Sequence, residues 1–346
     1  MAVVGVLMNK DDLRNLGAYL EQNVQGFSGL KHVEKFAVGQ SNPTFCLDTG
    51  DEKFVLRCKP KGKLVQSAHA IDREYRVLSA LADTDVPIAK TILYCEDSDV
   101  LGTEFYLMEF VQGEIFSDPA LPNLDNHQRT DIYQAQCSAL AAIHSVDLRA
   151  TNLTDYGRPG SYFERQYERW SQQYRSKKIE RVEAMDQLIS WLGRNMPSDD
   201  GRATLVHGDY RLDNLMISTA DWSIAAVVDW ELSTIGHPYA DLAYQCMQWR
   251  LPNNPIAKGL GAIDRNKVGI PTERQYIAEY CKLAGNVPIA NWSFYLAFSF
   301  FRLAAILHGI LERSAGGNAS NPQAVAVGDM YRNVAKMGLD VVHNGY

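Results

Sequence analysis

The segment LVHGDYRLDNLMI, residues 205–217, crowds a histidine, an arginine, two aspartates and an asparagine against an apolar run that is typical of a strand. Asp209 and Asn214 are five residues apart, and Asp229 ends a second apolar run fifteen residues beyond Asn214. Two short strands fit between them, so a hairpin could bring Asn214 and Asp229 together. Their amide and carboxylate oxygens suit magnesium, which leaves Asp209 to accept a proton from a substrate hydroxyl. The spacing therefore indicates phosphoryl transfer, although a capping aspartate and a turn asparagine are the structural alternative.

The strand-like run KFVLRC, residues 53–58, offers a cation for a phosphate group. Strand alternation puts Arg57 and Lys59 on one face and apolar side chains on the other. In the helix that follows, apolar residues at i, i+3, i+4 and i+7 spacing put Glu74 on the inward face, where a carboxylate is costly unless it is paired. Arg57 is the natural partner of Glu74, with an ordinary interior ion pair that binds no ligand as the alternative.

The first third of the chain is rich in strands and the rest is mainly helical. Strands are predicted at 32–38, 44–48, 53–58, 89–95 and 104–110, with helices at 11–24 and 68–83. Further helices are predicted at 127–146, 161–175, 178–194, 239–249, 272–284, 292–313 and 321–338, with short strands at 215–218 and 223–229. This order predicts an α+β fold with two lobes around a ligand cleft: a small antiparallel β-sheet lobe, residues 1–111, and a larger, mainly helical lobe, residues 112–346.

Composition and charge exclude several classes of function. A length of 346 residues fits two domains or lobes, and a net charge of −7 argues against nucleic-acid binding. The six cysteines form no CxxC pair, and the amino-terminal residues lack the basic region of a signal peptide, so we expect a cytoplasmic protein. The apolar stretch Trp292–Leu311 carries Arg302 and His308, which predicts a buried core helix and no membrane span.

Three segments resemble the aminoglycoside-phosphotransferase (APH) and choline-kinase-like superfamily. They are HGDYRLDNLMI (207–217), VVDWELSTIGHPYADLAY (227–244) and YLMEFVQGE (106–114). Within that superfamily the chain is similar to the phosphotransferase domains associated with acyl-CoA dehydrogenases. The resemblance implies a protein-kinase-like bilobal fold and Mg²⁺-dependent transfer of the γ-phosphate of ATP or GTP.

The resemblance also implies roles for individual residues. Asp209 would be the catalytic base, with Asn214 and Asp229 as the magnesium ligands. Arg57 takes the position of a phosphate-binding lysine, with Glu74 as its pair. Arginine is a planar, bidentate cation where most of the superfamily has lysine, which leaves the phosphate contact and the nucleotide preference open. Lys59, on the same strand face, could share the role.

The nucleotide would contact two further segments. Met108 would lie against the adenine, with backbone groups of Glu109 and Val111 reading its edge. The loop VGQSNPTF, residues 38–45, would offer backbone N–H groups to the phosphates, although it lacks a GxGxxG pattern and an ordinary hairpin loop fits it as well. Its candidate residues are Gly39, Ser41 and Asn42.

Several other polar residues lie within or close to the motif. We expect His207 to be structural, although an imidazole base for Asp209 is the alternative. Asp241 stands at a predicted helix start, where a carboxylate caps backbone N–H groups, and is expected to steady the loop of Asp209. Open roles remain for Arg211, Asp213, Glu231 and His237.

Two other classes of function stay open. A nucleotide-binding module without catalysis would need no base, but Asp209 and Asp229 are both present. A metal-dependent hydrolase would activate water with paired metals, but the segment lacks an HExxH or HxH pair. The hydrolase ligands would be His207, Asp209, Asp213, Asp229, His237 and Asp241.

The acceptor is expected to be a hydroxyl of a small molecule. Arg165, Arg169 and Arg250 lie in aromatic-rich segments and favour an anionic or acyl-type acceptor over a cationic aminoglycoside. The resemblance points to hydroxyacyl-CoA-like molecules, with an aminoglycoside or other antibiotic as the alternative. The sequence leaves the oligomeric state undetermined.

Overall fold

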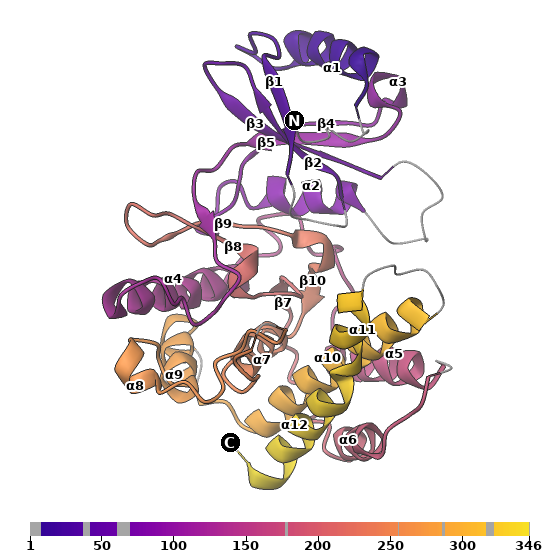
Figure 1. Cartoon of the computed structure of the whole chain (residues 1–346), viewed down its shortest axis with the longest axis vertical. Helices are drawn as coiled ribbons and strands as arrows, with labels where there is room; N and C mark the ends of the chain where they lie inside the picture. Colours follow the sequence, from indigo (N-terminus) through magenta and orange to yellow (C-terminus); the bar gives the residue numbers. More distant parts are fainter. Residues whose placement is uncertain are drawn as a thin grey trace. The chain divides into compact units, whose positions relative to one another are not determined.

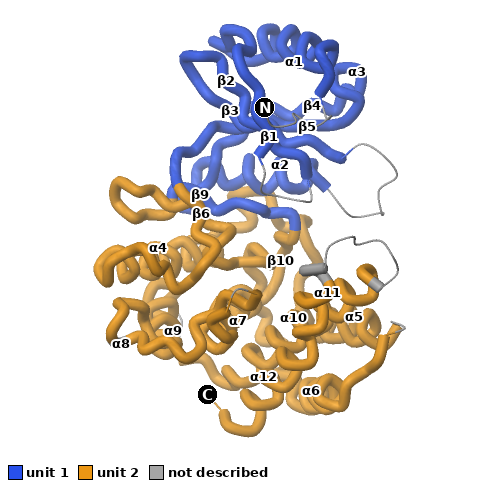
Figure 2. The backbone as a smooth tube through the Cα atoms, in the orientation of Figure 1, with its two compact units in different colours: residues 1–113, 225–231 blue, residues 114–224, 232–346 orange. Residues whose placement is uncertain are grey.

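The computed structural model describes residues 8–36, 42–60, 70–176, 179–254, 256–285, 288–315 and 322–345. The chain divides into two compact units (Figure 2). Unit 1 contains residues 1–113 and 225–231, and unit 2 contains residues 114–224 and 232–346. The chain thus returns to unit 1 for one short segment, which carries Asp229.

Unit 1 is built on a five-stranded antiparallel sheet with the strand order β1-β2-β3-β5-β4 (Figure 1). Its strands are β1 (His32–Lys35), β2 (Thr44–Asp48), β3 (Lys53–Cys58), β4 (Thr91–Cys95) and β5 (Phe105–Glu109). Its helices are α1 (Lys10–Asn23), α2 (Ile71–Ala80) and α3 (Ser98–Leu101). Strands β2 and β3 begin and end at the predicted residues.

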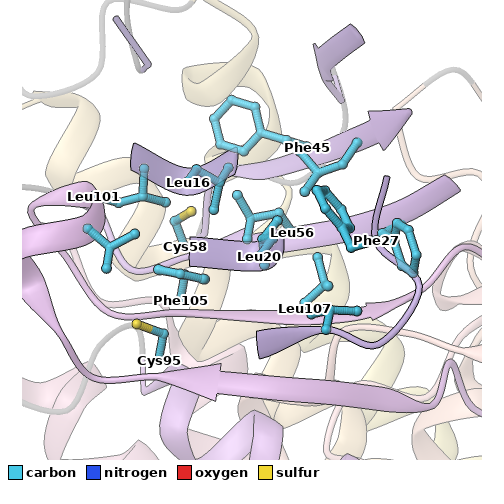
Figure 3. Close-up of a cluster of buried hydrophobic side chains, with 14 residues drawn as sticks. Leu16, Leu20, Phe27, Phe45, Leu56, Cys58, Cys95, Leu101, Phe105 and Leu107 are labelled. Carbon is cyan, nitrogen blue, oxygen red and sulfur yellow. The ribbon is translucent and has the colours of Figure 1, made fainter. Parts of the chain in front are cut away.

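An apolar core joins α1 to one face of this sheet (Figure 3). Leu16 and Leu20 of α1 cluster with Leu56 of β3 and Leu107 of β5, and all four are fully buried. Because side chains alternate along a strand, burying Leu56 on this face turns the neighbouring Arg57 toward the opposite face, where α2 contacts the sheet. The alternation expected for β3 is confirmed.

Unit 2 is mainly helical. Its helices are α4 (Asn126–His144), α5 (Tyr162–Ser176), α6 (Glu183–Arg194), α7 (Tyr239–Met247), α8 (Arg265–Val268), α9 (Glu273–Leu283), α10 (Trp292–Ala315), α11 (Pro322–Asp329) and α12 (Tyr331–Asn344). Two short antiparallel pairs accompany them, β7 (Thr204–Val206) with β10 (Thr234–Gly236) and β6 (Glu114–Ile115) with β8 (Leu215–Ile217). The 3-10 helix η1 (Leu212–Asn214) precedes β8, and the segment that returns to unit 1 begins within β9 (Ile224–Val227) and ends within η2 (Trp230–Leu232).

Helix α10 is the central helix of unit 2 and packs against α5, α6, α7, α11 and α12. Within it, Trp292–Ser314 is long and apolar enough to cross a membrane by length and composition alone, and 72% of its most apolar window is buried inside the structure. Arg302 and His308 are both buried in this packing. This burial is typical of the core helix of a soluble protein.

Two helix predictions need correction. The helix expected over 321–338 is two helices, α11 and α12, because Met330 N–H bonds the carbonyl oxygen of Val327, three residues back, and the helical turn tightens there. The helix expected from residue 178 begins at Glu183. The short elements α3, α8, β7 and β10 were not predicted, because three or four residues are too few to show a period.

Candidate functional site

The strand cation and the helix glutamate of unit 1 form the predicted ion pair. Arg57 Nε lies 2.8 Å from Glu74 Oε2, and Arg57 Nη2 lies 3.2 Å from Asp229 Oδ1. Tyr106 is the residue directly across from Arg57 in the β3–β5 register and is also fully buried. We call these four residues the Arg57 cluster. It joins the sheet, α2 and the 225–231 segment through one guanidinium group.

Burial dominates the electrostatics of the Arg57 cluster. It raises the pKa of Glu74 to about 7, against the opposing effect of the Arg57 charge. Burial alone would lower the pKa of Arg57, but the carboxylates of Glu74 and Asp229 raise it above its ordinary value. Arg57 is therefore a permanent cation, while the Glu74 carboxylate is held in place at a cost in desolvation.

Asp229 has an unusual backbone conformation. Its φ is +65°, in the left-handed region that residues with a Cβ rarely adopt. The next residue, Trp230, is buried, and its indole Nε1–H donates to Val227 O at 2.9 Å, which closes the turn around Asp229. Such conformations persist only where the surroundings hold them, and they are frequent at functional sites.

In unit 2, residues 207–214 form a loop that we call the Asp209 loop. Gly208 has a φ of +85°, and a Cβ at this position would lie 2.5 Å from Leu232 O. The N–H groups of His207 and Gly208 donate to the two carboxylate oxygens of Asp241, at 2.6 and 2.9 Å. Asp241 was expected to steady this loop, and that prediction is confirmed. The expected cap on its own helix is wrong, because both oxygens of Asp241 are turned toward the loop.

A buried network extends behind Asp241. His144 Nε2 lies 3.5 Å from Asp241 Oδ2, and His144 Nδ1 lies 2.6 Å from the hydroxyl of Tyr280. Burial acts to raise the pKa of Asp241, but His144 and the loop N–H groups hold it below its ordinary value. Arg302 of α10 donates to Gly208 O from the other side. The backbone before Asp209 is therefore fixed by both a donor and an acceptor.

Asn214 holds Asp209 directly. Its Nδ2 donates to Asp209 O at 2.8 Å and to Asp209 Oδ2 at 3.0 Å. Because the amide nitrogen makes both of these hydrogen bonds, the amide oxygen of Asn214 points away from Asp209. This oxygen is the atom suited to a hard cation, and it remains for a ligand. Arg211 Nε lies 3.7 Å from Asp209 Oδ1, and Arg211 Nη2 donates to Asp213. Arg211 and Asp213 thus form a charged pair beside the Asp209 carboxylate.

Other predicted nucleotide residues have mixed outcomes. Gly39 and Ser41 lie outside the described residues. Asn42 is buried, and its carbonyl accepts a hydrogen bond from Thr44 Oγ1. Met108 lies half-buried on β5. The N–H of Glu109 donates to Lys90 O at 2.9 Å, so the Glu109 backbone group that remains for the predicted adenine contact is its carbonyl.

Lys59 and Arg250 each form an ion pair that was not predicted. Lys59 Nζ pairs with Glu104 Oε1 at 3.0 Å and does not join the Arg57 cluster. Arg250 Nε pairs with Glu273 Oε2 at 3.0 Å, which neutralises one of the charges that favoured an anionic acceptor. The sequence could not show either partner, because each lies more than twenty residues away along the chain.

His207 and His237 are both buried and make contacts that hold the surrounding structure. His207 is fully buried and its Nδ1 accepts the N–H of Asp209 at 3.2 Å. His237 is buried, stacks on Tyr295 and lies 3.3 Å from Asp200 Oδ1, and burial lowers its pKa. Within the described part of the chain, no group of three or more His, Cys, Asp or Glu side chains could hold a metal ion. The arrangement does not favour the hydrolase alternative.

Four residues that support the candidate site were not predicted from the sequence: Tyr106, His144, Tyr280 and Arg302. Arg302 gave a signal, a charge inside an apolar helix, that was used only to exclude a membrane span. The other three gave none, because tyrosine and histidine in apolar helices and strands are common core residues.

An antiparallel sheet with a cation paired to a helix glutamate, and a helical unit that carries an Asp209–Asn214 loop, define a kinase-like phosphotransferase fold. A solved structure from Ralstonia eutropha, provisionally described as an aminoglycoside phosphotransferase, has a TM-score of 0.89 and 45% identity, and covers 96% of this chain and 98% of its own. A thermostable mutant of aminoglycoside phosphotransferase APH(4)-Ia, solved with ADP and hygromycin B, has a TM-score of 0.60 at 16% identity, covering 93% of this chain and 97% of its own.

The sequence profile of APH, the phosphotransferase enzyme family, matches residues 32–270. Acyl-CoA dehydrogenase family member 10 of Mus musculus is 46% identical over 314 residues, which are 90% of this chain and 29% of that protein. The chain spans less than half the length of the curated relatives it matches. The chain belongs to the APH phosphotransferase family, and the predicted kinase-like α+β fold is confirmed.

Proposed function

We propose that this chain is a magnesium-dependent phosphotransferase that moves the γ-phosphate of ATP or GTP to a hydroxyl of a small molecule. The observation that carries the proposal is the Asp209 loop. Its Asp209 carboxylate is bound by Asn214 Nδ2 at 3.0 Å, and its backbone is fixed two residues earlier by Asp241. Catalysis of phosphoryl transfer depends on positioning and charge, so a base held this firmly suits the reaction.

In this reaction Asp209 orients the acceptor hydroxyl and accepts its proton. Arg57 supplies positive charge to the phosphate oxygens of the nucleotide, and Glu74 fixes the direction of its guanidinium group. Removing the base from such a reaction typically costs a factor of about 100 or more in rate.

The chain offers suitable ligands for magnesium. Asn214 provides an amide oxygen and Asp229 a carboxylate whose side chain is 37% exposed, and hard oxygen donors of this kind suit Mg²⁺. One Asp229 oxygen meets Arg57, which leaves the second oxygen for a ligand. The ion, when bound, would neutralise charge on the nucleotide phosphates.

For the nucleotide itself, we propose the phosphate loop of Gly39, Ser41 and Asn42, and an adenine contact with Met108 and the backbone of Glu109 and Val111. The Glu109 contact would use its carbonyl group, since its N–H is already donated. The ADP in the APH(4)-Ia structure supports a nucleotide co-substrate.

For the acceptor, we propose a hydroxyacyl-CoA-like molecule. The relatives that contain a region similar to this chain are named as acyl-CoA dehydrogenase family members, and a phosphotransferase that is part of such a protein would share its acyl substrates. We further propose a cytoplasmic location without nucleic-acid or membrane partners, in keeping with six cysteines that are all free thiols.

The test is a screen of hydroxyacyl-CoAs, other hydroxylated metabolites and aminoglycosides for ATP consumption in the presence of Mg²⁺. We expect acceptor-dependent turnover with hydroxyacyl-CoAs, and its loss by about 100-fold or more in Asp209→Asn. Asp340→Asn, the same exchange at an exposed position of α12, is the matched control. Transfer to aminoglycosides alone would overturn the acceptor, and full activity of Asp209→Asn would overturn the role of Asp209.

A further inference from the structure

Lys258 lies in a loop of unit 2 beyond the end of α7. Lys258 N–H donates to Asn254 O at 2.9 Å, and Gly259 N–H donates to Pro252 O at 3.0 Å. Lys258 has a φ of +45°, in the left-handed region that a residue with a side chain seldom adopts. A residue keeps this conformation only where its neighbours hold it, so the start of the Lys258 side chain is fixed by the loop.

The ammonium group of Lys258 meets a neutral partner. Its Nζ donates to the Ser117 hydroxyl at 3.0 Å, and among the described residues no carboxylate lies within salt-bridge distance of it. Lys267, by contrast, pairs with Asp264 at 2.8 Å. The positive charge of Lys258 is therefore not neutralised by a direct ion pair, although the side chain is held at its tip.

The position of Ser117 brings this charge to the Asp209 loop. In the antiparallel β6–β8 pair Ile115 lies across from Met216; β6 ends at Ile115 and Ser117 follows two residues later, while Asn214 directly precedes β8. Strand β6 also contacts η1, the turn that contains Asn214. The contact between Lys258 and Ser117 therefore lies beside the end of the loop that carries the proposed base.

Apolar surface accompanies the cation, since Ile256 is 51% exposed and Ile115 is 43% exposed. Each isoleucine stands two residues from one end of the contact between Lys258 and Ser117.

We propose that Lys258 is a specificity-determining residue that binds a phosphate group carried by the acceptor, with the two isoleucines contacting its aliphatic part. The inference deepens the proposed function and rests on it for the identity of the reaction. Lysine binds phosphate as a point charge, and a cation in this place would repel a polycationic aminoglycoside. The acceptor is then a phosphate-bearing molecule with an apolar arm.

Binding of two small probes to the whole chain tests this assignment without any turnover. 4′-Phosphopantetheine and pantetheine differ by one phosphate and lack adenine, so neither imitates the nucleotide. By isothermal titration calorimetry we expect the wild type to bind 4′-phosphopantetheine more tightly than pantetheine. Lys258→Gln should reduce that preference about tenfold, the size of one hydrogen-bonded charge contact, and Lys258→Arg should keep most of it.

Lys267→Gln is the matched control, because it removes an exposed lysine that already has an acidic partner. The proposal is overturned if the wild type fails to bind 4′-phosphopantetheine or binds both probes equally. It is also overturned if Lys267→Gln reduces the preference for 4′-phosphopantetheine as much as Lys258→Gln does. Failure of the proposed function is distinguishable, because it would appear as phosphate-dependent binding without transfer to any hydroxyl.

Discussion

Replacing Asp241 with asparagine would test whether this buried carboxylate holds the Asp209 loop. Asp241 has no exposed surface, and its two oxygens accept the N–H groups of His207 at 2.6 Å and Gly208 at 2.9 Å. Asparagine has nearly the same volume but keeps only one acceptor oxygen. Asp241→Asn therefore places an NH₂ group against one of the two buried N–H donors.

The size of the effect follows from these contacts. A buried donor without an acceptor costs about 1–3 kcal/mol, and replacing a charge-assisted hydrogen bond by a neutral one costs about 1 kcal/mol more. We expect Asp241→Asn to lower the free energy of unfolding by about 3 kcal/mol. The loop leads directly to Asp209, so phosphoryl transfer should fall more than nucleotide binding does.

The variant should also differ from the wild type in acid. The pKa of Asp241 is lowered from 3.8, because contacts with His144 and the loop N–H groups outweigh burial. The folded chain therefore binds this proton less readily than the unfolded chain does. The stabilisation is present above pH 3.8 and is lost as the pH falls through the folded pKa, and a variant without the carboxyl lacks this dependence.

Urea unfolding at neutral pH, and melting temperatures at a series of lower pH values, would measure both effects. Asp340→Asn makes the same chemical change at an exposed position of α12 and should leave stability within about 0.5 kcal/mol of the wild type. Equal free energies of unfolding for Asp241→Asn and Asp340→Asn would refute the reasoning. An identical acid dependence of the wild type and Asp241→Asn would refute the sign of the pKa shift.

Glu74→Gln should flatten the pH dependence of the melting temperature. Burial raises the pKa of Glu74 from 4.5 to about 7, so the stability that Glu74 contributes is fully present below pH 4.5 and is lost as the pH rises through about 7. A steeper dependence in the variant would contradict this. Gly208→Ala should cost at least about 3 kcal/mol in urea unfolding, because it adds a clash with a carbonyl oxygen to a positive φ. Gly201→Ala, with a positive φ and open space, should cost only about 1 kcal/mol, and equal costs would remove the clash from the explanation. Arg57→Lys should lower the free energy of unfolding by about 1 kcal/mol, because one ammonium cannot hold both carboxylates. The reverse exchange at a single-carboxylate pair, Lys59→Arg, should change it little, and a larger loss there than in Arg57→Lys would count against this account.

Much of the fold could be predicted because its signals are local. In strands β2 and β3 the large apolar residues Phe and Leu alternate with less buried residues, and α2 has an apolar stripe that left Glu74 as its one inward carboxylate. The break between α11 and α12 depends on a single tightened turn at Met330, which leaves the apolar period on each side intact. Periodicity therefore identified the helical segment but not its division.

The residues of the candidate site also differ in whether a local sequence signal could identify them. Asp209, Asn214 and Arg57 could be proposed from the sequence because the proposal depends on short spacings and on the cost of an unpaired charge at Glu74. His144 contacts Asp241 and Tyr280 contacts His144, the latter over a separation of 136 residues, and no spacing rule connects them. The sequence also could not show that Lys59 forms an ion pair with Glu104 and Arg250 with Glu273, because such pairs are determined by tertiary packing.

The geometry of the Arg57 cluster explains why arginine suits position 57. Nε meets Glu74 and Nη2 meets Asp229, so two nitrogens of one rigid plane hold two carboxylates in fixed directions. A lysine ammonium has no plane and would leave the angle between the carboxylates undetermined. Because Asp229 also carries an unfavourable φ of +65°, the ion pair helps to hold that backbone in place. Arginine at this position therefore orients Asp229 as well as supplying the charge for the proposed phosphate contact, whereas a lysine of the same charge would not hold the Asp229 segment in this way.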